Sequence, residues 1–146
     1  MDYRKYTKEQ LIAMLCEREK KNAGNTPAAV WETIKHYGLQ KQEYFIVILL
    51  DGAHQIIKHA VVSMGLVNRT LAHPREVFAP ALIERATAIV IAHNHPSGNL
   101  EHSPDDMELT LRLKKAGDLL GITVLDHIIF SACAFHSMCE AGEFFS

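Results

Sequence analysis

Two apolar runs constrain the fold of this 146-residue chain more than any other feature. One is EYFIVILL at residues 43–50, and the other is TAIVIAHN at residues 87–94. Both are rich in β-branched residues, and neither shows the apolar–polar alternation of a strand with one wet face. Each therefore predicts a strand that is buried on both faces, in a sheet that has helices on either side.

The segments around these runs predict the remaining elements. Capping signals and apolar spacing predict helices over residues 7–21, 26–38, 73–86 and 103–121. Gly38 and Gly121 should end the second and the fourth of these helices. Pro80 should disturb the third helix. The apolar side of that helix is expected to comprise Val77, Phe78, Ala81 and Leu82. Further strands are expected over residues 56–67 after a hairpin at DGAHQ, over 122–131 and, in a short form, over 134–140.

The order of these elements predicts an α/β fold with a mixed sheet flanked by helices. The chain is long enough for one ordinary domain. Residues 41–146 should form that domain, and residues 1–40 a short N-terminal helical extension.

The composition limits the class of protein. Apolar residues make up 48% of the chain and charged residues 22%, which is typical of a globular protein. The net charge of −2 argues against a protein that coats phosphate backbones, so direct nucleic-acid binding is not expected. The three cysteines form no C-x-x-C pair. No apolar run reaches the roughly 20 residues of a membrane helix, and the first residues lack an export signal. We therefore expect a cytoplasmic protein with reduced thiols and no membrane contact.

A pair of histidines ends the second apolar run and predicts a metal site. Residues i and i+2 of a strand face the same side, so His93 and His95 should project together. Neutral imidazoles can bind zinc, and Asp106 in the first turn of the next helix can supply a third ligand beside a water. The simpler interpretation is a polar strand end, with Asp106 favouring the positive end of its helix and Ser103 only capping it.

The spacing of these residues resembles a known motif. HNHPSG followed by a serine and an aspartate is similar to the JAMM motif of the MPN/JAB-domain metalloproteases. The matching residues are His93, His95, Pro96, Ser103 and Asp106. The segments HPREVF, AHNHPSG and VLDHIIF resemble the bacterial RadC-type branch, over most of the chain. The resemblance implies a three-layer MPN/JAB core, cytidine-deaminase-like in its architecture, and one Zn²⁺ per chain.

The resemblance also implies roles for further residues. Glu43 matches the family's general base by its place at the start of an early strand, although a solvated glutamate is common there. Ser103 would help to stabilise the oxyanion, a role that does not exclude helix capping. His73 should help to start its helix, and both His73 and His127 recur in the family pattern and would support the site. Asn99 and His102 depart from the usual RadC-type pattern, and His102 is expected to be an ordinary loop residue.

The leading functional hypothesis is a zinc-dependent hydrolase that cleaves an amide in a peptide or protein whose identity the sequence does not give. The alternative is a RadC-type accessory protein of DNA repair or of a mobile element, without proteolysis. A metal-free scaffold is a further alternative, although such proteins typically lose part of the motif. A zinc deaminase is excluded, because its H-x-E and P-C-x-x-C motifs are absent from the sequence. An exposed edge strand could support a homodimer.

Overall fold

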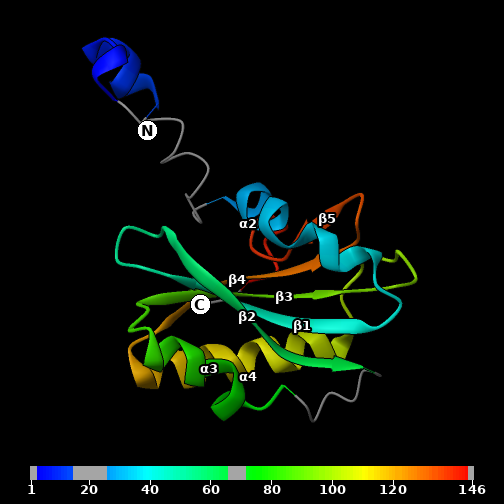
Figure 1. Ribbon diagram of the computed structural model, residues 1–146. Coiled ribbons are helices and arrows are strands. Elements are labelled where there is room, and N and C mark those ends of the chain that lie inside the picture. Colours follow the sequence, from blue (N-terminus) through cyan, green and yellow to red (C-terminus); the bar gives the residue numbers. More distant parts are fainter. Residues whose placement is uncertain (1–2, 15–25, 66–71, 145–146) are drawn as a thin grey trace.

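The computed structural model describes residues 3–14, 26–65 and 72–144. Residues 26–65 and 72–144 fold around a five-stranded sheet (Figure 1). The strand order is β2-β1-β3-β4-β5. Strands β3 and β4 are parallel, and the other neighbouring pairs are antiparallel. The strands are β1 Glu43–Leu50, β2 Ile56–Gly65, β3 Ala88–Asn94, β4 Thr123–Phe130 and β5 Phe135–Ser137. The mixed sheet predicted from the sequence is confirmed.

Helices cover both faces of this sheet. Helices α3 and α4 lie over one face and α2 over the other, which gives three layers (Figure 1). The helices are η1 Tyr3–Lys5, α2 Pro27–Ile34, η2 Lys35–Leu39, α3 Pro74–Ile83 and α4 Pro104–Leu120. Residues 8–14 are also helical, and the rest of the helix expected over 7–21 lies outside the described residues. Thr7 and Gln10 form the expected capping box, with main-chain to side-chain distances of 2.9 and 3.2 Å.

The central strands divide the core into two halves. In β1, Val47 and Leu49 pack with helices α3 and α4, whereas Ile46 and Ile48 pack with α2. Side chains of one strand alternate between the faces of a sheet, so both halves draw on the same strands. The absence of polar residues inside β1 thus follows from burial on both faces, as predicted.

Helix α2 ends earlier than the sequence indicated. Its α-helical part stops at Ile34, and the chain continues as the 3-10 helix η2 through Gly38 to Leu39. Gly38 is therefore not the stop signal. A Cβ atom at this position would lie 2.3 Å from the main-chain nitrogen of Ala132, so glycine permits a close approach. Val30 in α2 is fully buried against the sheet. The division of the chain at residue 40 stays a prediction.

Helix α3 differs from expectation at two residues. It runs through Pro80 without a break, because the proline removes only one hydrogen bond near the end of a ten-residue helix. Val77 and Ala81 are fully buried, but Leu82 is 54% exposed. Each residue turns a helix by roughly 100°, which carries Leu82 past the edge of the buried stripe.

Two features of the structure concern the expectations about membrane helices and cysteines. Among the described residues, no helix combines the length and apolar character that crossing a bilayer requires. Cys133 and Cys139 are free thiols, and Cys16 lies outside the described residues.

Candidate metal centre

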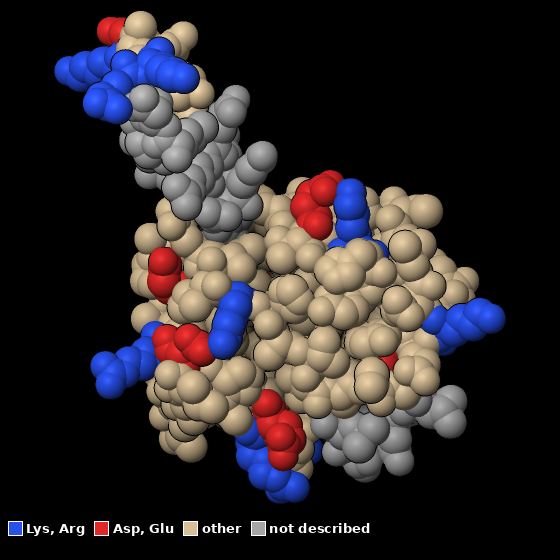
Figure 2. Space-filling model, in the orientation of Figure 1, with Lys and Arg blue, Asp and Glu red and all other residues tan. Residues whose placement is uncertain are grey.

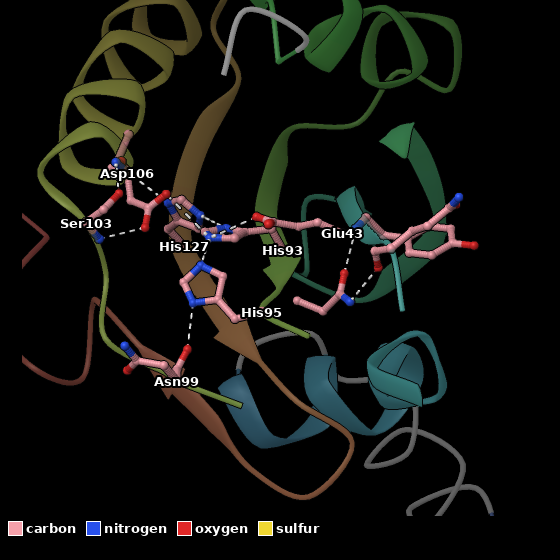
Figure 3. A network of polar contacts seen from close by, with 11 residues as sticks. Glu43, His93, His95, Asn99, Ser103, Asp106 and His127 are labelled. Carbon is pink, nitrogen blue, oxygen red and sulfur yellow. Dashed lines mark hydrogen bonds and ion pairs between the residues drawn. The ribbon is translucent and has the colours of Figure 1, made fainter. Parts of the chain in front are cut away.

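The pairing of β1 with β3 brings a glutamate and two histidines together. Phe45 is opposite His93 in the sheet, so Glu43, two residues earlier, faces the same side as His93 and His95. The main-chain N–H of His95 donates to the carbonyl of Phe130 at 3.1 Å, which extends the alignment of β3 with β4 by one residue. Figure 3 shows the three side chains converging, with His93 between its neighbours.

The ligand atoms of these three residues are close enough to share one metal ion. One atom from each of Glu43, His93 and His95 lies within 4.8 Å of the others. The Nε2 atoms of His93 and His95 are 2.9 Å apart, and Oε1 of Glu43 is 3.9 Å from Nε2 of His93. His93 is buried, while Glu43 and His95 are half-buried and reachable from outside.

Asp106 approaches His93 from helix α4, but it lies outside the group of Glu43, His93 and His95 whose ligand atoms are within 4.8 Å of one another. Its Oδ1 lies 3.4 Å from Nε2 of His93, and its Oδ2 accepts the main-chain N–H of Ser103 at 2.7 Å. Burial alone would raise the pKa of Asp106, but the imidazole of His93 and the main-chain N–H of Ser103 lower it below its usual range. Asp106 is therefore ionised at neutral pH and is available to a cation.

Ser103 is the N-cap of α4, as expected. Its Oγ accepts the N–H of Asp106 at 3.1 Å, which completes a capping box with the Asp106 carboxylate. Accepting this bond uses a lone pair and leaves the hydroxyl proton able to donate elsewhere. Capping and a catalytic contact are thus compatible at Ser103.

A tight turn after β3 fixes the protonation pattern of His95. Gly98 has φ +81° and donates its N–H to the carbonyl of His95 at 2.9 Å. This turn brings the carbonyl of Asn99 to 2.6 Å from Nδ1 of His95. A carbonyl only accepts, so we infer that Nδ1 carries the proton and that neutral His95 has its lone pair on Nε2. The contact uses the Asn99 main chain, which explains how the site tolerates an unusual side chain there.

Two further residues support His93. Nδ1 of His93 lies 2.7 Å from Nε2 of His127, and Nδ1 of His127 lies 2.6 Å from Oγ1 of Thr110. Burial first, and then the charge of His93, lowers the pKa of His127 well below its usual value, so this imidazole is neutral. His73 caps helix α3, where its side chain accepts the main-chain N–H of Arg75. Thr110 was not predicted from the sequence. Its only signal is the four-residue spacing from Asp106, which places both residues on one helix face.

His102 is tied to the C-terminal part of the described chain. Its Nε2 contacts the carboxylate of Glu143, whose other oxygen lies 2.6 Å from Nε2 of His136. His102 is half-buried and thus more than an ordinary exposed loop residue. The Glu143 carboxylate links the loop before α4 to β5.

The metal-centre residues open into a cavity of about 360 Å³. Its lining consists of Glu43, His95, Asn99, Glu101, His102, Ser103 and Asp106. The lining combines imidazoles and carboxylates and includes no lysine or arginine. It therefore suits a cation and a neutral or cationic ligand better than an anion.

The donor set fits zinc. Two nitrogens bound tetrahedrally at the usual zinc distance would lie roughly 3.3 Å apart. The observed separations are 2.9 Å between His93 and His95 and 3.4 Å between His93 and Asp106. Both separations that involve His93 are close to this value.

Comparison with known proteins agrees with this geometry. A family model described as RadC-like JAB domain matches residues 24–143. A UPF0758 protein of Geotalea uraniireducens is 45% identical over 118 residues, which are 80% of this chain and 52% of the relative. A UPF0758 protein of Methanospirillum hungatei is 50% identical over 103 residues, or 70% of this chain and 46% of the relative. The chain spans about half the length of these curated relatives. It belongs to the RadC-like JAB domain family.

Proposed function

We propose that this domain is a zinc-dependent hydrolase that cleaves an amide bond in a peptide or protein. The observation that carries the proposal is the convergence of two imidazole nitrogens, 2.9 Å apart, beside the carboxylates of Glu43 and Asp106. Two such nitrogens with carboxylates nearby form a common catalytic zinc site. His93, His95 and Asp106 would be the ligands.

Each residue of the site would have a separate role in amide hydrolysis. A bound Zn²⁺ would acidify a water and polarise the carbonyl of the substrate. Glu43, 3.9 Å from the ligand nitrogen of His93, would take the proton of the attacking water and return it to the leaving nitrogen. The hydroxyl of Ser103 would donate to the carbonyl oxygen as that oxygen gains negative charge.

Metal content tests the proposal first. We expect about one zinc per chain in protein purified without a histidine tag, measured by inductively coupled plasma mass spectrometry. His95→Ala should lose this zinc. His54→Asn is the matched control, because it removes an imidazole at the other end of β1 and keeps a residue that tolerates the positive φ of His54. A parent protein that takes up no zinc from solution would refute the proposal.

The roles of the two carboxylates can be separated. Glu43→Gln should retain zinc but lose amide hydrolysis by about 100-fold or more, since the amide cannot accept the proton of water. Asp106→Asn should lose zinc. If Glu43→Gln loses the metal and Asp106→Asn keeps it, Glu43 is a metal ligand and Asp106 is not. Hydrolysis would be followed by mass spectrometry of a peptide mixture.

A DNA-associated role without hydrolysis is the alternative. Figure 2 shows lysine and arginine side chains in small separate groups, with acidic groups beside several of them, over one face of the molecule. This distribution gives no continuous positive surface on that face for a phosphate backbone. Retention of labelled DNA at physiological salt, by a protein that hydrolyses no peptide, would favour the alternative.

A further inference from the structure

We propose that Thr110 and His127 are positioning residues that hold His93 in the one neutral tautomer whose Nε2 can bind a cation. The inference rests on the proposed metal centre, but it concerns a hydrogen-bond chain that exists without the metal. The chain connects helix α4, strand β4 and strand β3. Figure 3 shows its last two members, His127 and His93, beside each other.

The chain has three short links. Oγ1 of Thr110 lies 2.6 Å from the main-chain carbonyl oxygen of Asp106 and 2.6 Å from Nδ1 of His127. Nε2 of His127 then lies 2.7 Å from Nδ1 of His93. The exposed fractions of Thr110, His127 and His93 are 1%, 0% and 3%, so water has almost no access to these groups. The protons in the chain must therefore be distributed among the protein groups themselves.

The carbonyl at one end sets the direction of every link. A carbonyl oxygen only accepts, so the single hydroxyl proton of Thr110 points at Asp106. Oγ1 must then accept from Nδ1–H of His127, which leaves the lone pair of the neutral ring on Nε2. That lone pair accepts from Nδ1–H of His93. The lone pair of neutral His93 is consequently on Nε2, the atom that faces His95.

The opposite direction is disfavoured. If Thr110 donated to His127 instead, two oxygen acceptors would lie 2.6 Å apart with no proton between them. The reversed chain would also place a proton on Nε2 of His93, where it would block a metal ligand.

Two separate sets of hydrogen bonds therefore orient the Nε2 lone pairs of His93 and His95 toward each other. The carbonyl of Asn99 fixes His95, and the carbonyl of Asp106, through Thr110 and His127, fixes His93. The resulting lone pairs face each other across 2.9 Å, an arrangement that a cation between them stabilises. Asp106 contributes both its carbonyl at one end of the chain and its carboxylate, 3.4 Å from His93 Nε2.

The test compares Thr110→Val, which keeps the shape of the side chain and removes the hydroxyl, with Thr110→Ser, which keeps the hydroxyl. Nitrogen-15 spectra of the imidazoles at pH 8, in metal-free protein, report which ring nitrogen carries the proton. We expect His93 protonated on Nδ1 in the parent and in Thr110→Ser, and a substantial Nε2–H population in Thr110→Val.

Zinc affinity provides the second measurement. Competition with a chromogenic chelator should show zinc binding about 10–100-fold weaker in Thr110→Val and nearly unchanged in Thr110→Ser. Thr33→Val is the matched control, because the Thr33 hydroxyl makes the same type of bond, to the carbonyl of Ala29 at 3.1 Å, in a helix away from the site. Its zinc affinity should equal that of the parent.

The outcomes distinguish this inference from the proposed function. A proton on Nε2 of His93 in the metal-free parent overturns the inference, even if no variant folds. Weaker zinc binding by Thr110→Val without a change of tautomer also overturns it, because the hydroxyl would then act only on stability. If the parent shows the expected tautomer, Thr110→Val alters it and neither protein binds zinc, the positioning chain stands and the proposed zinc hydrolase fails.

Discussion

At the scale of single residues, Gly98 decides where the lone pair of His95 points. Its φ of +81° lies in the left-handed region, and the turn it forms returns the Asn99 carbonyl to the His95 ring. A Cβ atom at Gly98 would meet no described atom within 4 Å apart from its chain neighbours. The requirement for glycine is therefore one of backbone conformation rather than of space.

This requirement predicts unequal effects of two substitutions at residue 98. Gly98→Val should cost about 1–3 kcal/mol of strain, because a β-branched residue resists positive φ. If the turn relaxes to relieve that strain, His95 loses its acceptor and zinc binding should weaken about tenfold. Gly98→Asn should bind zinc more tightly than Gly98→Val, since asparagine tolerates this conformation. Equal affinities in the chelator competition would show that the turn does not orient His95.

At the scale of elements, an asparagine side chain completes the sheet where main-chain pairing stops. The pairing of β1 with β3 ends at Phe45 and His93, so Glu43 lies beyond it. Asn94, fully buried, accepts the main-chain N–H of Tyr44 at 2.6 Å and donates to the carbonyl of Gln42 at 3.0 Å. These two groups flank Glu43, so the Asn94 amide fixes the backbone that carries its carboxylate.

Asn94→Ala should therefore loosen the start of β1. Removing the amide leaves two main-chain groups without this partner, at a cost of about 1–3 kcal/mol in unfolding free energy. Hydrogen exchange at the Tyr44 amide should accelerate more than exchange at Ile48 in the middle of the strand. Val90→Ala, a buried change elsewhere in β3, is the control and should affect both amides alike. Equal acceleration in Asn94→Ala would mean that only global stability has changed.

The sequence predicted elements better than it predicted contacts between them. The buried strands, the Ser103 cap and the histidine pair each depend on residues close together in the chain, so local patterns revealed them. The link from Thr110 to His127 and the link from His102 to Glu143 depend on how separate elements pack, which local spacing does not encode. The prediction that Gly38 ends a helix was wrong for the same reason. Glycine is required there by the close approach of Ala132, which is distant in the sequence.

At the scale of the whole molecule, two histidines couple stability to pH. The pKa of His59 is lowered by burial and then by the charge of His36, and that of His127 by burial and then by the charge of His93. In the unfolded chain both return to about 6.5. As pH falls through that value, the unfolded chain takes up protons that the native protein does not, so native stability falls.

The free energy of unfolding of metal-free protein should therefore be lower at pH 5.5 than at pH 7.5, measured by urea denaturation in chelator. His59→Gln removes one of the two histidines and keeps a side chain that can hydrogen-bond to Tyr37, 3.0 Å away in the parent. Its stability should change less between these pH values than that of the parent. An identical change in the two proteins would show that His59 has its ordinary pKa when folded.

The parts of the metal centre are far apart along the chain. Glu43, the histidine pair and Asp106 come from three elements, and His127 comes from a fourth. In the unfolded chain only His93 and His95 are neighbours, and nothing there fixes their tautomers. An ion would thus find its full set of ligands only after these elements had assembled. The polypeptide would fold first and acquire its metal afterwards. The bound ion would then stabilise the native protein against unfolding, and folding would not require it.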